Sequence, residues 1–150
     1  MFVVDAFFVP RADNNLENKP GTLDRLMAVM AASGIDLRAL SLAETKDFGI
    51  ARMIVDDAFG AVNVLKNADY IASLTPVLAF GVPDEPGGLS KLLKKFTENG
   101  VNIEYMYAFL DTKRVGQACM IFRVSDTEAS EKALVNAGLK PLTQEELSEL

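Results

Sequence analysis

The stretch Asn18-Lys19-Pro20-Gly21-Thr22-Leu23 recurs 66 residues further on as Asp84-Glu85-Pro86-Gly87-Gly88-Leu89. The same offset relates Gly34-Ile35-Asp36-Leu37 to Gly100-Val101-Asn102-Ile103, with no gap between the two stretches. Similarity at a fixed spacing is the sequence signature of a structural repeat. The chain therefore consists of two copies of one module, and the fold of one copy predicts the fold of the whole.

Outside this block the offset changes slightly. Val55-Asp56-Asp57 aligns with Val124-Ser125-Asp126 at an offset of 69, and Ala6 to Pro10 aligns with Ala79 to Pro83 at an offset of 73. Both length differences fall where turns and loops are expected. The repeat thus covers nearly the whole chain.

Each copy contains one strongly amphipathic helix after its Pro-Gly pair. Apolar residues recur there at spacings of three and four. They are Leu23, Leu26, Met27 and Met30 in the first copy and Leu89, Leu92, Leu93 and Phe96 in the second. Pro20 and Pro86 suit helix entry, and Gly34 and Gly100 suit the left-handed residue that ends a helix. Asp57 and Asp126 are expected to cap a second helix in each copy.

Short β-rich or alternating runs predict the strands. In the second copy Ile103 and Tyr105 are expected to share the inward face. The predicted strands are 2–9, 35–39, 49–55 and 70–73 in the first copy, and 77–82, 101–105, 117–124 and 140–142 in the second. The order β-α-β-β-α-β occurs twice, which predicts an α+β fold of two ferredoxin-like modules, residues 1–74 and 75–150, paired side by side. Each module would be an antiparallel sheet with both helices packed on one face.

Composition and charge restrict the partners. The chain has 150 residues, 49% of them apolar and 24% charged, and its formal net charge is −6. A protein that neutralises phosphates needs a basic surface, so nucleic acid is not expected as a partner, and an anionic membrane surface would repel the chain. The longest apolar run, 26–32, is too short to cross a bilayer. We expect a cytoplasmic protein.

The chain has no histidine and one cysteine. Ser-His-Asp and Cys-His catalysis and His-ligated metal sites are therefore excluded. Cys119 lies in an apolar run and is expected to be a buried strand residue in a reducing compartment. Of the remaining acid–base groups, Glu104 and Tyr105 are neighbours, but they would point to opposite faces of a strand. We predict no enzyme activity, no metal site and no cofactor.

The two Pro-Gly stretches and the glycine stretches that follow the helices resemble the ACT domain, a regulatory module of enzymes of amino-acid metabolism. The second copy matches the family pattern Asp-x-Pro-Gly-x-Leu and Gly-(Ile/Val)-Asn-Ile more closely. The chain is similar to stand-alone tandem ACT proteins and, more distantly, to the regulatory subunits of acetolactate synthase. This resemblance implies a non-enzymatic sensor that binds an amino acid where two modules meet and acts on a metabolic enzyme.

The resemblance directs attention to the residues of both turns. A ligand carboxylate is stabilised at a helix N-terminus, and glycine lets a backbone approach closely. Asn102 offers a donor and an acceptor, and Asp84 or Glu85 would pair with an ammonium group. Asp36 would repel a carboxylate, so the second copy is the preferred site. The candidates are Asp84, Glu85, Pro86, Gly87, Gly88, Leu89, Val101 and Asn102 in the second copy, and Asn18, Pro20, Gly21, Thr22, Leu23, Ile35 and Asp36 in the first.

Besides the amino-acid sensor, which is the first class of function, two others remain open on the sequence. A Pro-Gly pair also occurs at strand-to-helix turns for backbone reasons alone. The chain would then be a ligand-independent regulatory or structural subunit of an amino-acid-metabolism enzyme such as acetolactate synthase. An enzyme is the third and least favoured class. A homodimer is expected in either of the first two cases, because such sheets seldom stay uncovered.

Overall fold

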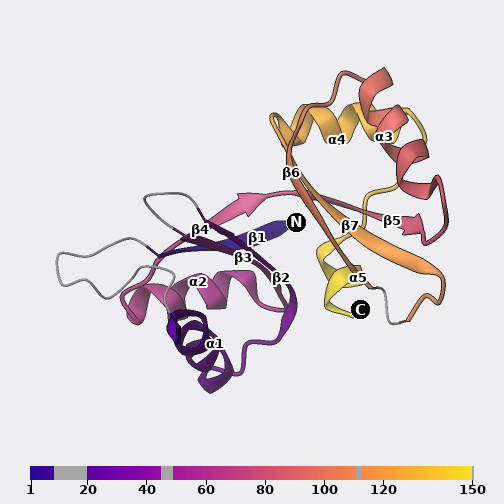
Figure 1. The fold of residues 1–150 in the computed structure, drawn as a ribbon. Helices are drawn as coiled ribbons and strands as arrows, with labels where there is room; N and C mark the ends of the chain where they lie inside the picture. Colours follow the sequence, from indigo (N-terminus) through magenta and orange to yellow (C-terminus); the bar gives the residue numbers. More distant parts are fainter. Residues whose placement is uncertain (9–19, 45–48, 111–112, 150) are drawn as a thin grey trace. The chain divides into compact units, whose positions relative to one another are not determined.

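The computed structural model describes residues 1–8, 20–44, 49–110 and 113–149. The chain divides into two compact units, one formed by Phe2–Thr75 and the other by Met1 together with Pro76–Leu150. Each unit combines an antiparallel sheet with helices (Figure 1), which confirms the predicted α+β class and the two ferredoxin-like modules.

The first unit contains a four-stranded sheet in the order β2-β3-β1-β4. Figure 1 shows α1 and α2 on the same face of this sheet. The elements in chain order are β1 (Phe2–Phe8), α1 (Thr22–Ala32), β2 (Leu37–Glu44), β3 (Gly49–Val55), α2 (Ala58–Asn67) and β4 (Ile71–Pro76). This is the predicted order of elements, with β4 completing the edge of the sheet next to β1.

The second unit contains a three-stranded sheet in the order β5-β7-β6. Its elements are β5 (Leu78–Pro83), α3 (Gly88–Glu98), β6 (Ile103–Leu110), β7 (Gln117–Val124), α4 (Thr127–Asn136) and α5 (Gln144–Ser148). The prediction of a fourth strand at 140–142 was wrong, because that segment is not a strand. Its Leu142 N–H donates to the Ala79 carbonyl of β5 at 2.7 Å, on the edge where a fourth strand would pair.

The helix boundaries follow the residues that predicted them. Asp57 accepts a hydrogen bond from the Gly60 N–H at 2.9 Å, and Asp126 accepts one from the Ala129 N–H at 3.0 Å. Gly34 and Gly100 have φ values of 71° and 66°, in the region where a side chain is unfavourable. These predicted caps and stops are confirmed.

Both helix stripes pack into a separate core for each unit, as predicted. In the first unit Leu26 and Met30 pack with residues of β1, β3 and α2. In the second unit the core is aromatic, with the Phe96 ring centroid 4.7 Å from that of Phe122 and 5.7 Å from that of Phe80. Such contacts add to the stability that area burial provides.

A register shift between Ile103 and Tyr105 changes which side of β6 faces the core. Met106 packs on the core with Ile103. The expectation that Tyr105 points inward was therefore wrong. Tyr105 instead stacks on Tyr107, with ring centroids 6.5 Å apart.

Candidate ligand-binding site

The turn from β5 into α3 is held by backbone hydrogen bonds. The Glu85 N–H donates to the Pro83 carbonyl at 2.9 Å, and the Gly88 N–H donates to the Glu85 carbonyl at 3.1 Å. Gly87 is the N-cap residue, with a φ of 85°, and no side chain in the described part of the chain caps this helix. Helices α2 and α4, in contrast, each have an aspartate cap. The N-terminus of α3 thus keeps its positive end without a compensating carboxylate.

The two glycines of this turn have different roles. We expected the glycine of each Pro-Gly pair, Gly21 and Gly87, to let the backbone approach a ligand closely, and this stays a prediction. A Cβ on Gly87 would meet nothing within 4 Å, so within the protein this residue is required for its positive φ. A close approach between parts of the chain occurs at Gly88, where a Cβ would lie 2.3 Å from the Pro83 carbonyl oxygen.

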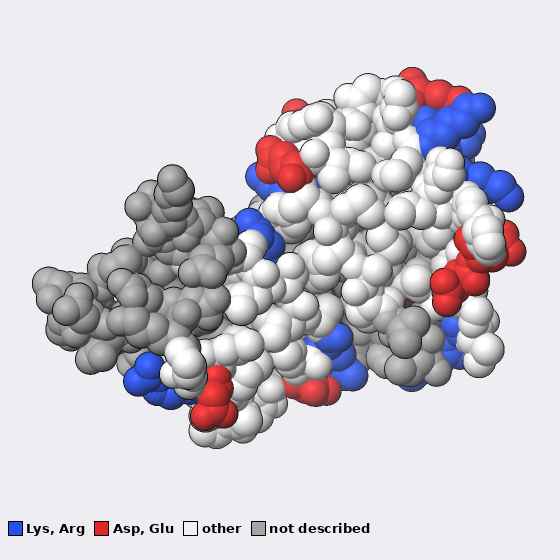
Figure 2. Space-filling view, in the orientation of Figure 1, with Lys and Arg blue, Asp and Glu red and all other residues white. Residues whose placement is uncertain are grey.

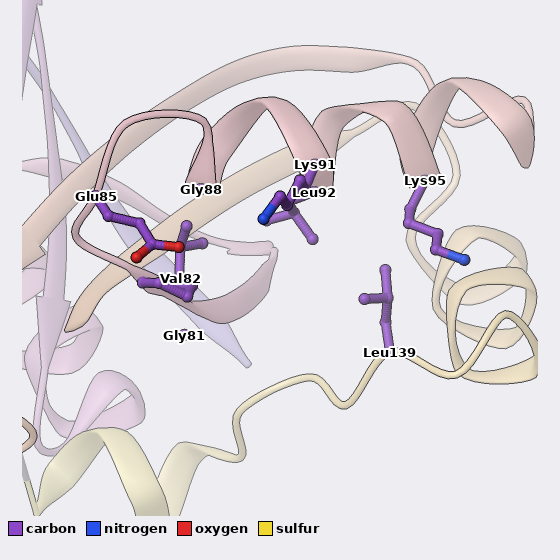
Figure 3. Close-up of a pocket in the computed structure, with 9 residues that line it drawn as sticks. Gly81, Val82, Glu85, Gly88, Lys91, Leu92, Lys95 and Leu139 are labelled. Carbon is purple, nitrogen blue, oxygen red and sulfur yellow. The ribbon is translucent and has the colours of Figure 1, made fainter. Parts of the chain in front are cut away.

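A pocket of about 260 Å³ lies beside this turn, along the face of α3. Its walls come from the end of β5, the turn, α3 and the segment after α4 (Figure 3). The apolar side chains of Val82, Leu92 and Leu139 converge on it. The full lining is Gly81, Val82, Pro83, Glu85, Gly88, Lys91, Leu92, Lys95 and Leu139.

Charges of both signs surround the pocket. Glu85, Lys91 and Lys95 are exposed, and none of the three forms an ion pair with another described residue. Figure 2 shows basic side chains gathered over α3 and acidic ones near the turn before it. Figure 3 shows the Glu85 carboxylate at one end of the pocket and Lys95 toward the other end, near Leu139. Lys91 lies between them beside Leu92, with its amine directed toward the Glu85 end.

Two of the predicted residues of the second copy, Glu85 and Gly88, line this pocket. Asp84, Pro86 and Gly87 are exposed in the turn but are not part of the lining. Leu89 and Val101 pack against the core. Asn102 is also outside the lining, and its amide donates to the Ser125 hydroxyl at 2.9 Å.

The predicted residues of the first copy are distributed differently. Pro20 and Gly21 form an exposed turn, and Thr22 is buried. Leu23 and Ile35 pack against the core. The Asp36 carboxylate pairs with Arg38 at 3.2 Å, and the Asp36 N–H donates to Asp56 at 3.0 Å. Asn18 lies outside the described residues.

Sequence reasoning missed most of the walls of the pocket. The sequence predicts Val82 only as a strand residue and Leu92 only as part of an apolar helix stripe, and Lys91 and Lys95 were not among the candidate residues. Leu139 follows α4, about 50 residues from the turn, and no sequence pattern connects the two. Among the described residues, no three Cys, Asp or Glu side chains gather as a metal site would. No described helix is both long and apolar enough to cross a membrane.

The comparisons with known proteins agree with this fold. A structure of protein BT0572 from Bacteroides thetaiotaomicron has 32% identity and a TM-score of 0.85, over 99% of this chain and 96% of that one. The regulatory subunits of aspartate kinase from Thermus thermophilus and Thermus flavus share the fold. Their identities are 17% and 16%, and their TM-scores 0.61 and 0.57. The matches cover 91% of this chain in both cases, and 91% and 92% of those chains.

No protein of curated function matches the chain significantly. The model of a protein family described as an ACT domain pair matches residues 10–150. That match spans both units and both Pro-Gly turns, so the chain belongs to the ACT domain pair family.

Proposed function

We propose that the protein is a cytoplasmic, non-enzymatic regulator that binds a small molecule, an amino acid, through its second unit. The observation that carries this proposal is the pocket at the second Pro-Gly turn, surrounded by one carboxylate and two ammonium groups that form no ion pair with the residues that the structure describes. A zwitterionic ligand needs a protein group of each sign, one for its carboxylate and one for its ammonium group. The location of the ligand between two modules, which the family resemblance implies, stays a prediction.

The signal would pass to an enzyme of amino-acid metabolism. The family match and the regulatory subunits of aspartate kinase that share the fold support this kind of partner. Binding in the micromolar to millimolar range releases about 4–8 kcal/mol, and allosteric coupling requires only about 1–3 kcal/mol. A modest metabolite site is therefore sufficient for such a switch.

We further propose a homodimer. β2 is an edge strand of its sheet, and Leu40 and Leu42 on it are 36% and 40% exposed. An edge strand with apolar side chains is a template for pairing with another chain. Sedimentation equilibrium would measure the mass of the particle, and a monomer at all concentrations would contradict this part of the proposal.

The proposal is tested by calorimetry and thermal unfolding of the whole chain against each of the twenty amino acids. We expect at least one to bind, and a ligand at a hundred times its dissociation constant raises the free energy of unfolding by about 2.7 kcal/mol. The absence of any response from folded protein at millimolar ligand would contradict amino-acid binding. A stoichiometric enzyme partner recovered from the native cell, unaffected by amino acids, would then favour the ligand-independent subunit.

A further inference from the structure

We infer that the pocket of the second unit selects an α-amino acid with an aliphatic side chain of about the size of leucine or methionine. This inference rests on the proposed function and specifies its ligand. It follows from three features of the pocket. Charges of opposite sign face its Glu85 end, its walls are apolar, and the part between Lys91 and Lys95 is about one turn of α3 long.

The charged end fits the two charges of an amino acid. Glu85 lies at one end of the pocket, and the Lys91 amine is directed toward that end (Figure 3). Neither residue forms an ion pair with another described residue. A ligand carboxylate would pair with the Lys91 ammonium, and its α-ammonium with the Glu85 carboxylate. Charge-assisted contacts of this kind are stronger than neutral hydrogen bonds and fix the orientation of the ligand.

The remainder of the pocket accepts an apolar side chain. From the charged end the walls continue along Val82 and Leu92 to Leu139. Lys91 and Lys95 are four residues apart on α3, so the part of the pocket between them covers about one helical turn, or roughly 5–6 Å. This length suits a side chain of three or four heavy atoms in a row. The volume of about 260 Å³ is smaller than the roughly 300–1,000 Å³ typical of larger ligands.

The second unit departs from the first at two wall positions of this pocket. Leu139 corresponds to Tyr70, since their N–H groups donate to the matching carbonyls of Leu134 and Leu65 at 3.0 and 2.9 Å. A larger, half-buried ring therefore packs on the core of the first unit where the second has Leu139. Gly88 corresponds to Thr22, which is buried.

The edge of the sheet differs as well. In the first unit β4 pairs with β1 along this edge. In the second unit the corresponding segment makes the Leu142–Ala79 hydrogen bond but does not become a strand. Because Ala79 and Gly81 are two residues apart in β5, the backbone of Gly81 is directed to the same edge, where it lines the pocket.

The far end of the pocket discriminates against charged side chains. A lysine or arginine ligand would bring its cationic end toward Lys95. A glutamate ligand would place a second carboxylate against the apolar walls formed by Leu92 and Leu139, where loss of hydration opposes it. We therefore expect L-leucine and L-methionine to bind more tightly than L-lysine, L-arginine and L-glutamate.

The inference is tested by calorimetry with L-leucine on the full chain. We expect Lys91→Ala and Glu85→Gln each to weaken binding about tenfold. Leu139→Tyr places the residue of the first unit in the pocket and should abolish binding, with the melting temperature recorded to show that the chain is folded. Two probes, 4-methylpentanoate and isopentylamine, each lack one charged group of leucine and should each bind about tenfold more weakly.

Two variants serve as matched controls. Lys94→Ala removes an exposed lysine of α3 that does not line the pocket, and Arg25→Ala removes the residue of α1 that corresponds to Lys91. Both should leave the affinity for L-leucine unchanged within twofold. Binding that is insensitive to Lys91→Ala and Glu85→Gln, or tighter binding of L-glutamate, would overturn the inference while the proposed function stands. Failure of all twenty amino acids to bind would overturn both.

Discussion

Gly88 lies against the carbonyl of Pro83, and a Cβ added to Gly88 would stand 2.3 Å from that oxygen. The turn and the first residue of α3 are thus locked together by a contact that only glycine permits. We expect Gly88→Ala to lower the free energy of unfolding by about 1–3 kcal/mol, because the backbone must move to relieve the overlap. Denaturation with urea, followed by circular dichroism, measures this change.

Ser90→Ala is the control for this variant. Ser90 is exposed two residues further along α3, and its replacement should change the free energy of unfolding by no more than about 0.5 kcal/mol. Equal stability of Gly88→Ala and the unmodified protein would show that the turn is not constrained by this contact.

Asn102 was predicted to bind the ligand, but its amide donates to the Ser125 hydroxyl at 2.9 Å. The Ser125 N–H in turn donates to the Asn102 carbonyl at 3.2 Å, so the two residues fasten the start of β6 to the end of β7. Asn102→Ala should lower the free energy of unfolding by about 0.5–1 kcal/mol and leave the affinity for amino acids unchanged. A tenfold loss of affinity in calorimetry would instead support the prediction that Asn102 contacts the ligand.

The Asp126 cap of α4 contributes to the free energy of unfolding through one hydrogen bond, and two substitutions can isolate that contribution. Asp126→Ala removes the acceptor for the Ala129 N–H and should cost about 1 kcal/mol of the free energy of unfolding. Asp126→Asn keeps a side-chain oxygen at the same place and should cost much less. If both variants lost the same stability in urea denaturation, the hydrogen bond to Ala129 would not be its source.

Asp5 is a buried charge in β1, only 6% exposed. Its carboxylate lies 3.8 Å from the Arg52 guanidinium of β3 and accepts a hydrogen bond from the Thr75 hydroxyl of β4. Asp5→Ala leaves the largely buried Arg52 without this carboxylate and should cost about 3 kcal/mol of the free energy of unfolding. Thr75→Val removes one hydrogen bond and should cost about 1 kcal/mol in the same denaturation experiment.

The stability of the short helix α5 should fall in acid. The Thr143 N–H donates to the Glu146 carboxylate at 2.9 Å. This hydrogen bond is the largest cause that lowers the pKa of Glu146 from its ordinary value of 4.5, and the charge of Lys140 lowers the pKa further. A carboxyl whose pKa is lowered on folding contributes its full stabilisation above the unfolded value, and that contribution is lost as the pH falls through the folded pKa. An NMR titration of the Thr143 amide should show this transition, and Glu146→Gln should remove it.

The features that the sequence predicted well are local ones. Asp126 needs only its own helix to act as a cap, and the φ values of Gly34 and Gly100 depend on the turns they occupy. The element order followed from the repeat itself. The position of Gly87 in the turn was predictable for the same reason.

The features that were predicted wrongly depend on pairing across the sheet. The alignment of Ala6 with Ala79 rested on residue identity, but Val4 lies opposite Met53 and Leu78 lies opposite Phe122. Because Met53 and Phe122 are equivalent in the repeat, the true correspondence is one residue away. A shift of one residue exchanges the two faces of a strand. The residue pattern of one strand does not determine the register in which its neighbour pairs with it.

The missing fourth strand of the second unit has a visible cause. Pro141 fixes its φ near −65°, whereas an antiparallel strand has φ near −140°. The segment was predicted as a strand by analogy with the first copy, and that analogy outweighed the proline. Leu139, which lines the pocket, belongs to the same irregular segment after α4, so the shared pattern could not predict this wall.

The junction between the modules has a practical consequence for anyone who wishes to exchange one module for another. β4 ends at Pro76 and β5 begins at Leu78, and the intervening Val77 N–H donates to the carbonyl of Met1 at 3.0 Å. A fragment that stopped at Leu74 would deprive Asp5 of the Thr75 hydroxyl, and one that began at Thr75 would lose the acceptor that Met1 provides. A chimera must therefore keep Thr75 with the first module and supply the second with a backbone carbonyl in the place of that of Met1.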